Sequence, residues 1–172
     1  SWLWFLYKYG LNGVLADDMG LGKTIQTLTL LQKAKEKDNR EPSLVICPTS
    51  VVFNWEKEIE KFTPNLKYMT LTGVDRKKKF KDISKYDVVI TSYALIRRDY
   101  EELKKEKFRY VILDESQNIK NAQSQTSKAC KDLQATHRLA LSGTPIENRL
   151  EELWSVFDFL MPGFLFDSNE FN

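Results

Sequence analysis

The stretch "GVLADDMGLGKT", residues 13–24, decides the fold class. The apolar run 13–16 predicts a strand, and a helix-like stretch begins near Lys23, directly after two glycines. Glycines let backbone N–H groups converge on an anion, and the positive end of the following helix points to the same place. The stretch therefore predicts a phosphate-binding loop between a strand and a helix, although Asp17 stands where the usual spacing has glycine. The alternative is a glycine turn with no ligand and Lys23 on the surface.

Short apolar runs alternate with helix-like stretches along the whole chain. Strands are predicted at 13–16, 43–48, 66–71, 86–92, 110–114 and 138–143, and helices near 23–38, 50–62, 74–84, 93–106, 122–134 and 149–160. The clearest helix has Val52, Trp55, Ile59 and Phe62 on one apolar stripe. The alternation predicts an α/β domain with a mostly parallel, doubly wound sheet, because such strands are rich in Val, Ile and Leu.

Polar motifs follow five of the predicted strands. They are "DDMGLGKT", "PTS", "TSY", "DESQ" and "SGTP". Ligands of parallel α/β sheets bind beyond the carboxyl ends of the strands. The five motifs therefore predict one functional edge of the sheet.

Composition sets only broad limits on function. Of 172 residues, 42% are apolar and 29% are charged, which is typical of a globular domain. The net charge of +2 is too small to indicate a nucleic-acid partner without local clustering. The two cysteines, Cys47 and Cys130, predict neither a disulfide framework nor a metal site, and they fit a reducing compartment. No apolar run has the length of a membrane span, so no membrane partner is expected.

An acidic pair completes a candidate nucleotide site. Asp114 ends the run "YVILD", and Glu115 follows it directly. In Mg²⁺-assisted phosphoryl transfer a carboxylate at such a strand end holds the metal, and its neighbour positions the attacking water. Lys23 would supply charge to the β- and γ-phosphates, and the Thr24 hydroxyl would ligate Mg²⁺. The alternative is two solvated carboxylates at a strand end.

The motifs in their order resemble those of the SWI/SNF-type ATPases of helicase superfamily two. These motifs are "LADDMGLGKTIQTL", "LVICPTSVVFNWEKEIEKF", "VVITSYALIRRD", "VILDESQNIKN" and "LALSGTPIENRLEELWSVFDFLMPGF". The resemblance implies a RecA-like P-loop NTPase lobe with three layers, the first of two lobes of an ATP-driven translocase on double-stranded DNA. Asp17 is normal in that family. Asp18 stands where the family has Glu, and Ser116 where it mostly has Ala.

The resemblance also implies roles for individual residues. ATP and Mg²⁺ would be bound by the loop residues Asp17, Asp18, Met19, Gly20, Leu21, Gly22, Lys23 and Thr24, with Thr24 and Asp114 at the metal. Catalysis would rest on Lys23, Asp114, Glu115 and Gln117. Hydrolysis would be coupled to DNA grip through Ser142, Gly143, Thr144 and Pro145. The DNA backbone would contact Pro48, Thr49, Ser50, Thr91, Ser92 and Tyr93, and a helix N-terminus with hydroxyls at 49–50 suits a phosphate.

Three other features of the sequence lie outside these motifs. The basic run "RKKKFK", 76–81, predicts a solvated helix face, with an auxiliary phosphate contact as the alternative. His137, the sole histidine, is expected to be structural. Trp154, Phe157 and Phe159 are expected in the core or against a neighbouring part of a longer chain.

We expect residues 1–172 to be one lobe of a longer two-lobed chain that remodels or displaces DNA-bound protein. The second lobe with its arginine fingers would lie outside these residues, so the isolated lobe should bind ATP weakly and hardly hydrolyse it. The alternatives are a nucleotide-gated binding module without translocation and an RNA helicase of the same superfamily. Details such as "DESQNIKN" suggest a bacterial or archaeal protein acting on nucleoid DNA in the cytoplasm, with a nuclear protein as the alternative.

Overall fold

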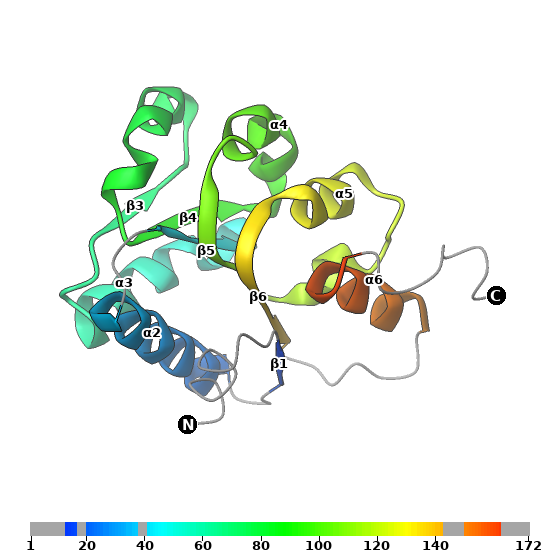
Figure 1. Ribbon diagram of the computed structural model, residues 1–172, viewed down its shortest axis with the longest axis horizontal. Helices are drawn as coiled ribbons and strands as arrows, with labels where there is room; N and C mark the ends of the chain where they lie inside the picture. Colours follow the sequence, from blue (N-terminus) through cyan, green and yellow to red (C-terminus); the bar gives the residue numbers. More distant parts are fainter. Residues whose placement is uncertain (1–12, 17–19, 38–40, 143–149, 163–172) are drawn as a thin grey trace.

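A central sheet with helices on both faces forms the body of the protein (Figure 1). The computed structural model describes residues 13–16, 20–37, 41–142 and 150–162. The strands are β1 (Gly13–Ala16), β2 (Ser43–Cys47), β3 (Tyr68–Thr70), β4 (Val88–Ser92), β5 (Lys107–Leu113) and β6 (Gln134–Ser142). The helices are α2 (Gly20–Lys37), η1 (Thr49–Val51), α3 (Val52–Phe62), η2 (Val74–Lys85), α4 (Tyr93–Leu103), η3 (Ser116–Ile119), α5 (Gln125–Asp132) and α6 (Leu150–Leu160), where η denotes a 3₁₀ helix.

The sheet confirms the predicted parallel topology. Its strand order is β1-β6-β5-β2-β4-β3, and each of the pairings between described strands is parallel. The strands at the centre, β2 and β4, are buried at every position. A strand covered on both faces favours apolar residues at successive positions, and this explains the Val, Ile and Leu runs in the middle of β2 and at the start of β4.

Two hydrophobic clusters lie between the three layers, one on each face of the sheet. Along β2, Leu44 and Ile46 belong to the cluster shared with η2, α4, α5 and α6, whereas Val45 and Cys47 belong to the cluster shared with α2 and α3. Successive side chains of a strand point to opposite faces, so one strand contributes to both clusters. The predicted three-layer α/β architecture is therefore confirmed.

Several element boundaries differ from those expected. β6 begins at residue 134 rather than 138, so His137 lies inside the strand instead of before it. The segment 74–85 is a 3₁₀ helix rather than an α-helix. Its inward residues Arg76, Phe80 and Ile83 recur at spacings of four and three, a pattern that both windings can produce.

The aromatic residues expected in the core divide into buried and exposed sets. Phe62, the last residue of α3, is 42% exposed, and the Lys61 ammonium lies 5.1 Å from its ring centroid. The stripe expected from Val52 to Phe62 therefore ends at Ile59. In α6 Phe159 is fully buried, whereas Phe157 is exposed. Within the described residues, no helix has both the length and the apolar character needed to cross a membrane.

Candidate functional site

The parallel sheet brings the predicted motifs to one edge. Ala16 pairs with Ser142 in register, and the strand ends of β2 and β4 meet as Cys47 pairs with Ser92. The backbone N–H of Asp114 continues the sheet by donating to the carbonyl of Ile46 at 2.8 Å. The end of each strand is therefore next to the end of its neighbour. The prediction of a single edge is confirmed for the described parts of the five motifs.

Lys23 is the most unusual cation of this edge. It lies in the first turn of α2, its side chain is buried with 2% of the residue exposed, and its Nζ has no hydrogen-bond partner among the described groups. Burying an ammonium group without a partner costs several kcal/mol, so proteins seldom leave one without a ligand. Thr24, the next residue, is also buried. The pair fits an anion held at the start of α2, and Lys23 is not on the surface as the alternative required.

Asp114 is the carboxylate that is expected to share the nucleotide site with Lys23. Its Oδ2 accepts a hydrogen bond from Trp55 Nε1 at 2.8 Å, and its Oδ1 accepts one from the backbone N–H of Glu115 at 2.9 Å. Burial raises the pKa of Asp114, the Trp55 hydrogen bond opposes that rise, and the charges of Glu115 and Lys23 act in opposite directions on it. A desolvated carboxylate of this kind gains from a nearby cation.

Glu115 has a backbone that its residue type rarely adopts. Its φ of 50° and ψ of 61° lie in the left-handed region, and it is the one non-glycine residue of the described chain with positive φ. Such a conformation costs on the order of 1–3 kcal/mol and persists where the surroundings impose it. Gln117 Nε2 donates to Glu115 Oε2 at 2.8 Å, and this contact holds the carboxylate in place.

The predicted DNA-contact residues divide into an exposed and a buried group. Thr49 and Ser50 are exposed and Pro48 is half-buried. Neither hydroxyl caps the helix that follows, since Val51 is the N-cap of α3 and no side chain bonds to its N-terminus. Thr49 and Ser50 therefore form no side-chain cap, and both hydroxyls remain at the surface.

The second group, Thr91, Ser92 and Tyr93, is buried. The Tyr93 hydroxyl donates to the backbone carbonyl of Asp114 at 2.7 Å. The Tyr93 side chain therefore belongs to the interior of the edge. DNA contacts at 91–93 stay a prediction, and they would have to come from the backbone rather than from these side chains.

Part of the predicted site lies outside the described residues. This holds for Asp17, Asp18 and Met19 of the loop and for Gly143, Thr144 and Pro145 of the coupling segment. Gly20, Leu21 and Gly22 lie in the first turn of α2, and Ser142 is buried at the end of β6. Ser142 thus reaches the edge beside β1, where the loop begins.

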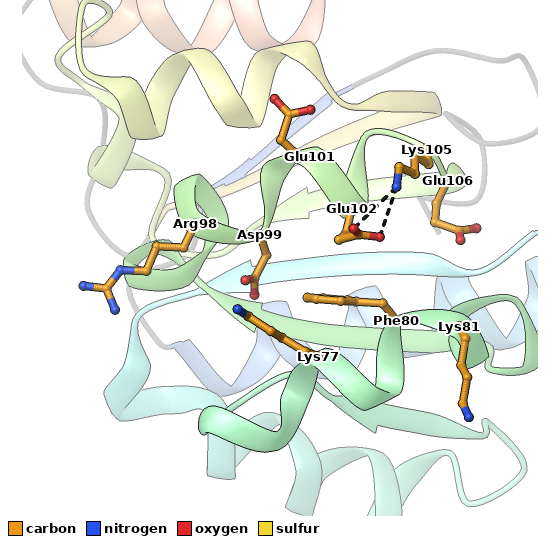
Figure 2. Close-up of a pocket in the computed structure, with 9 residues that line it drawn as sticks. All are labelled: Lys77, Phe80, Lys81, Arg98, Asp99, Glu101, Glu102, Lys105 and Glu106. Atoms are coloured by element: carbon orange, nitrogen blue, oxygen red, sulfur yellow. Dashed lines mark hydrogen bonds and ion pairs between the residues drawn. The ribbon is translucent and has the colours of Figure 1, made fainter.

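The basic run 76–81 differs from a uniformly solvated face. Arg76 is buried and bonds to Asp99 through Nε at 2.8 Å and Nη2 at 3.0 Å, so it joins η2 to α4. The lysines of the run are exposed. A cavity of about 580 Å³ lies between η2 and α4, and its lining includes both cations and carboxylates (Figure 2). Lys105 bonds to Glu102 there at 3.4 Å. None of the predicted nucleotide residues lines this cavity.

Residue-type patterns did not identify two members of the site. Trp55 was expected as core, and Tyr93 as a DNA contact, yet both bond to Asp114. A buried indole N–H or phenol O–H usually finds a partner. That rule signals that each ring has a polar neighbour, but it does not say which one.

Fold and site together define a RecA-like lobe of the P-loop class, with a buried lysine in the first turn of α2 and an acidic pair after β5 at the same edge of the sheet. The chain belongs to the SNF2-related domain family, whose model matches residues 1–172. Solved structures agree: the Sulfolobus solfataricus SWI2/SNF2 ATPase core in complex with dsDNA is 47% identical with a TM-score of 0.87, and the match covers 94% of this chain and 34% of that one.

Curated relatives come from distant organisms. The TATA-binding protein-associated factor MOT1 of Saccharomyces cerevisiae is 45% identical over 96% of this chain, and Helicase swr1 of Schizosaccharomyces pombe is 47% identical over 98% of it. YwqA of Bacillus subtilis is 47% identical over 96%. The chain spans 10%, 14% and 18% of these relatives, respectively. It therefore corresponds to a small part of each.

Proposed function

We propose that this chain is the ATP-binding and hydrolysing motor lobe of a duplex-DNA-dependent ATPase that remodels or displaces DNA-bound protein. The observation that carries the proposal is the buried Lys23 ammonium, which has no hydrogen-bond partner among the described groups and lies in the first turn of α2, on the same sheet edge as Asp114. The phosphates of a nucleotide would give this ammonium an anionic partner, and the N-terminus of a helix also favours an anion.

ATP would be held by the loop 17–24. Lys23 would pair with the β- and γ-phosphates, and Thr24 would bind Mg²⁺ through its hydroxyl. The described residues contain no cluster of three or more His, Cys, Asp or Glu side chains suited to a metal. Thr24 and Asp114 would therefore hold Mg²⁺ together with phosphate oxygens and water, as is common for this ion. When bound, Mg²⁺ would neutralise charge that develops on the phosphates.

Hydrolysis would depend on the orientation of the acidic pair. Asp114 is held by hydrogen bonds to both carboxylate oxygens. Glu115 would orient the attacking water, and Gln117 keeps the Glu115 carboxylate in place. Gln117 Oε1 is buried and has no partner among the described groups. It is thus free to respond to the nucleotide or to the coupling segment Ser142 to Pro145.

Double-stranded DNA is the proposed nucleic-acid partner. The exposed hydroxyls of Thr49 and Ser50 support a phosphate contact. Further support comes from the family and from the solved relative that is in complex with dsDNA. The TATA-binding protein-associated factor among the relatives supports a protein target that is itself DNA-bound.

Residues 1–172 would form one lobe and work with a second lobe of the same parent chain. The solved cores are about three times as long as the matched region, since this chain covers 34–35% of them. Yeast, bacterial and archaeal relatives are similarly identical, at 45–47%, so identity does not favour a nucleoid over a nuclear setting.

The decisive test is ATP turnover by the longer parent chain without nucleic acid, with duplex DNA, with single-stranded DNA and with RNA. Glu115→Gln serves as the control, because it keeps the size of the side chain and removes its charge. We expect stimulation by duplex DNA alone, and loss of turnover in the control.

Stimulation mainly by RNA would instead assign an RNA helicase. ATP binding without turnover under every condition would assign a nucleotide-gated binding module. Equal turnover of the parent and the Glu115→Gln protein would contradict the role given to Glu115.

A further inference from the structure

Asp114 receives a hydrogen bond from each of two helices. Trp55 Nε1 of α3 donates to the carboxylate Oδ2 at 2.8 Å, and the Tyr93 hydroxyl of α4 donates to the main-chain carbonyl at 2.7 Å. The donors lie 59 and 21 residues away from Asp114 in the sequence. The metal-binding candidate is therefore fixed from outside its own strand.

Both helices begin at the edge where DNA contacts are proposed. Trp55 lies one turn into α3, and α3 follows the 3₁₀ helix η1, which contains the exposed Thr49 and Ser50. Tyr93 is the first residue of α4, directly after Thr91 and Ser92. Each helix start is therefore joined to Asp114 through at most one helical turn and one hydrogen bond.

The two aromatic rings are packed too tightly to change orientation independently of their helices. Trp55 is fully buried and Tyr93 is 7% exposed, so neither ring can reorient without moving its neighbours. The other carboxylate oxygen, Oδ1, bonds to the Glu115 backbone N–H. Without the indole donor, the carboxylate would be held on one side only.

We propose that Trp55 and Tyr93 are positioning residues that couple duplex binding at the ends of β2 and β4 to the orientation of Asp114. This proposal rests on the proposed function. Its consequence is reciprocal: duplex DNA tightens Mg²⁺-ATP binding, and Mg²⁺-ATP changes the affinity for duplex DNA by the same factor.

The experiment uses the parent chain with Glu115→Gln, so that ATP is bound without being consumed. The Kd of a fluorescently labelled duplex is measured with and without Mg²⁺-ATP, and the ratio of the two values is the coupling factor. Trp55→Phe removes the indole N–H but keeps a buried ring, and Tyr93→Phe removes one oxygen atom. Ile59→Val is the matched control: it lies one turn further along the same buried face of α3 and has no polar atom.

We expect Trp55→Phe to reduce the coupling factor by at least about fivefold, since couplings between sites commonly amount to 5–150-fold. Tyr93→Phe should reduce it in the same direction. Ile59→Val should lower the melting temperature through its lost methyl group and leave the coupling factor unchanged. A purely structural role for Trp55 predicts the opposite pattern, a lower melting temperature with an unchanged coupling factor.

An unchanged coupling factor in both Phe variants would overturn the proposal. So would a duplex Kd that Mg²⁺-ATP does not alter in the Glu115→Gln parent. If Trp55→Phe does not fold, the result with Tyr93→Phe decides. Turnover of the protein without substitutions is measured alongside, so failure of the proposed function appears as absent duplex stimulation and is distinguished from failure of the coupling.

Discussion

Ser116 carries a buried hydroxyl without a hydrogen-bond partner among the described groups. Its Oγ therefore pays a desolvation cost that an alanine methyl group would not. We expect Ser116→Ala to raise the free energy of unfolding by about 1 kcal/mol and to keep ATP turnover. Urea unfolding of both proteins measures the difference.

Ser127→Ala is the matched control for that substitution. Ser127 is also buried, but its hydroxyl bonds to the carbonyls of Ile119 at 3.0 Å and Asn121 at 2.6 Å. Its removal should destabilise the protein by about 0.5–1.5 kcal/mol, because its hydrogen bonds are lost while the carbonyls of Ile119 and Asn121 keep the Ser155 hydroxyl and the Ser124 N–H as donors. Equal effects of the two substitutions would contradict the assignment of Ser116 as unsatisfied.

His137 makes stability depend on pH. Its ring lies 5.0 Å from the Tyr110 ring, and burial foremost, with Arg109 second, lowers its pKa below 6.5, while Glu41 opposes the shift. The unfolded chain therefore binds a proton at a higher pH than the folded one, and stability is lost as the pH falls from 6.5 through the folded-state pKa. His137→Gln should flatten the stability change between pH 7.5 and 5.5. The same slope in both proteins, measured by urea unfolding, would count against this account.

At the scale of elements, a buried ion pair joins η2 to α4 outside the nucleotide edge. Arg76 and Asp99 are 9% and 3% exposed. Arg76→Ala would leave a buried carboxylate without its cation, so we expect a loss of about 3–5 kcal/mol in unfolding free energy. Lys78→Ala, which removes an exposed pair with Asp75 at 3.9 Å, should change it by less than about 0.5 kcal/mol. Thermal and urea unfolding of the two variants give the comparison.

Elements also show what the sequence could and could not predict. Runs of apolar residues located the strands that carry the motifs, because a strand covered on both faces favours apolar residues at successive positions. Residue periodicity did not distinguish the 3₁₀ winding of η2, and it assigned Phe62 to the interior beyond the point where the buried stripe ends. Partners such as Trp55 for Asp114 depend on which strands are neighbours. That order, β2 beside β5, is not readable from local patterns.

At the scale of the whole molecule, the chain matches about a third of the solved ATPase cores. If a second lobe supplies arginine to the phosphates, the isolated 172-residue chain should turn over ATP on the order of 10³-fold or more slowly than its parent. Steady-state turnover of both proteins with duplex DNA gives this ratio. Similar rates would mean that the lobe is catalytically complete by itself.

The two cysteines lie on opposite faces of the sheet, Cys47 in the layer of α2 and α3 and Cys130 in the layer of α4 to α6. Both are fully buried, and burial raises the pKa of each thiol to about 12. The native chain should therefore resist alkylation, since the thiolate is the reacting form. Each thiol becomes reactive only when its own layer opens, so alkylation rates resolved by mass spectrometry would report separately on the breathing of the two halves. The two native cysteines would therefore report the opening of the two layers separately, without any engineered label.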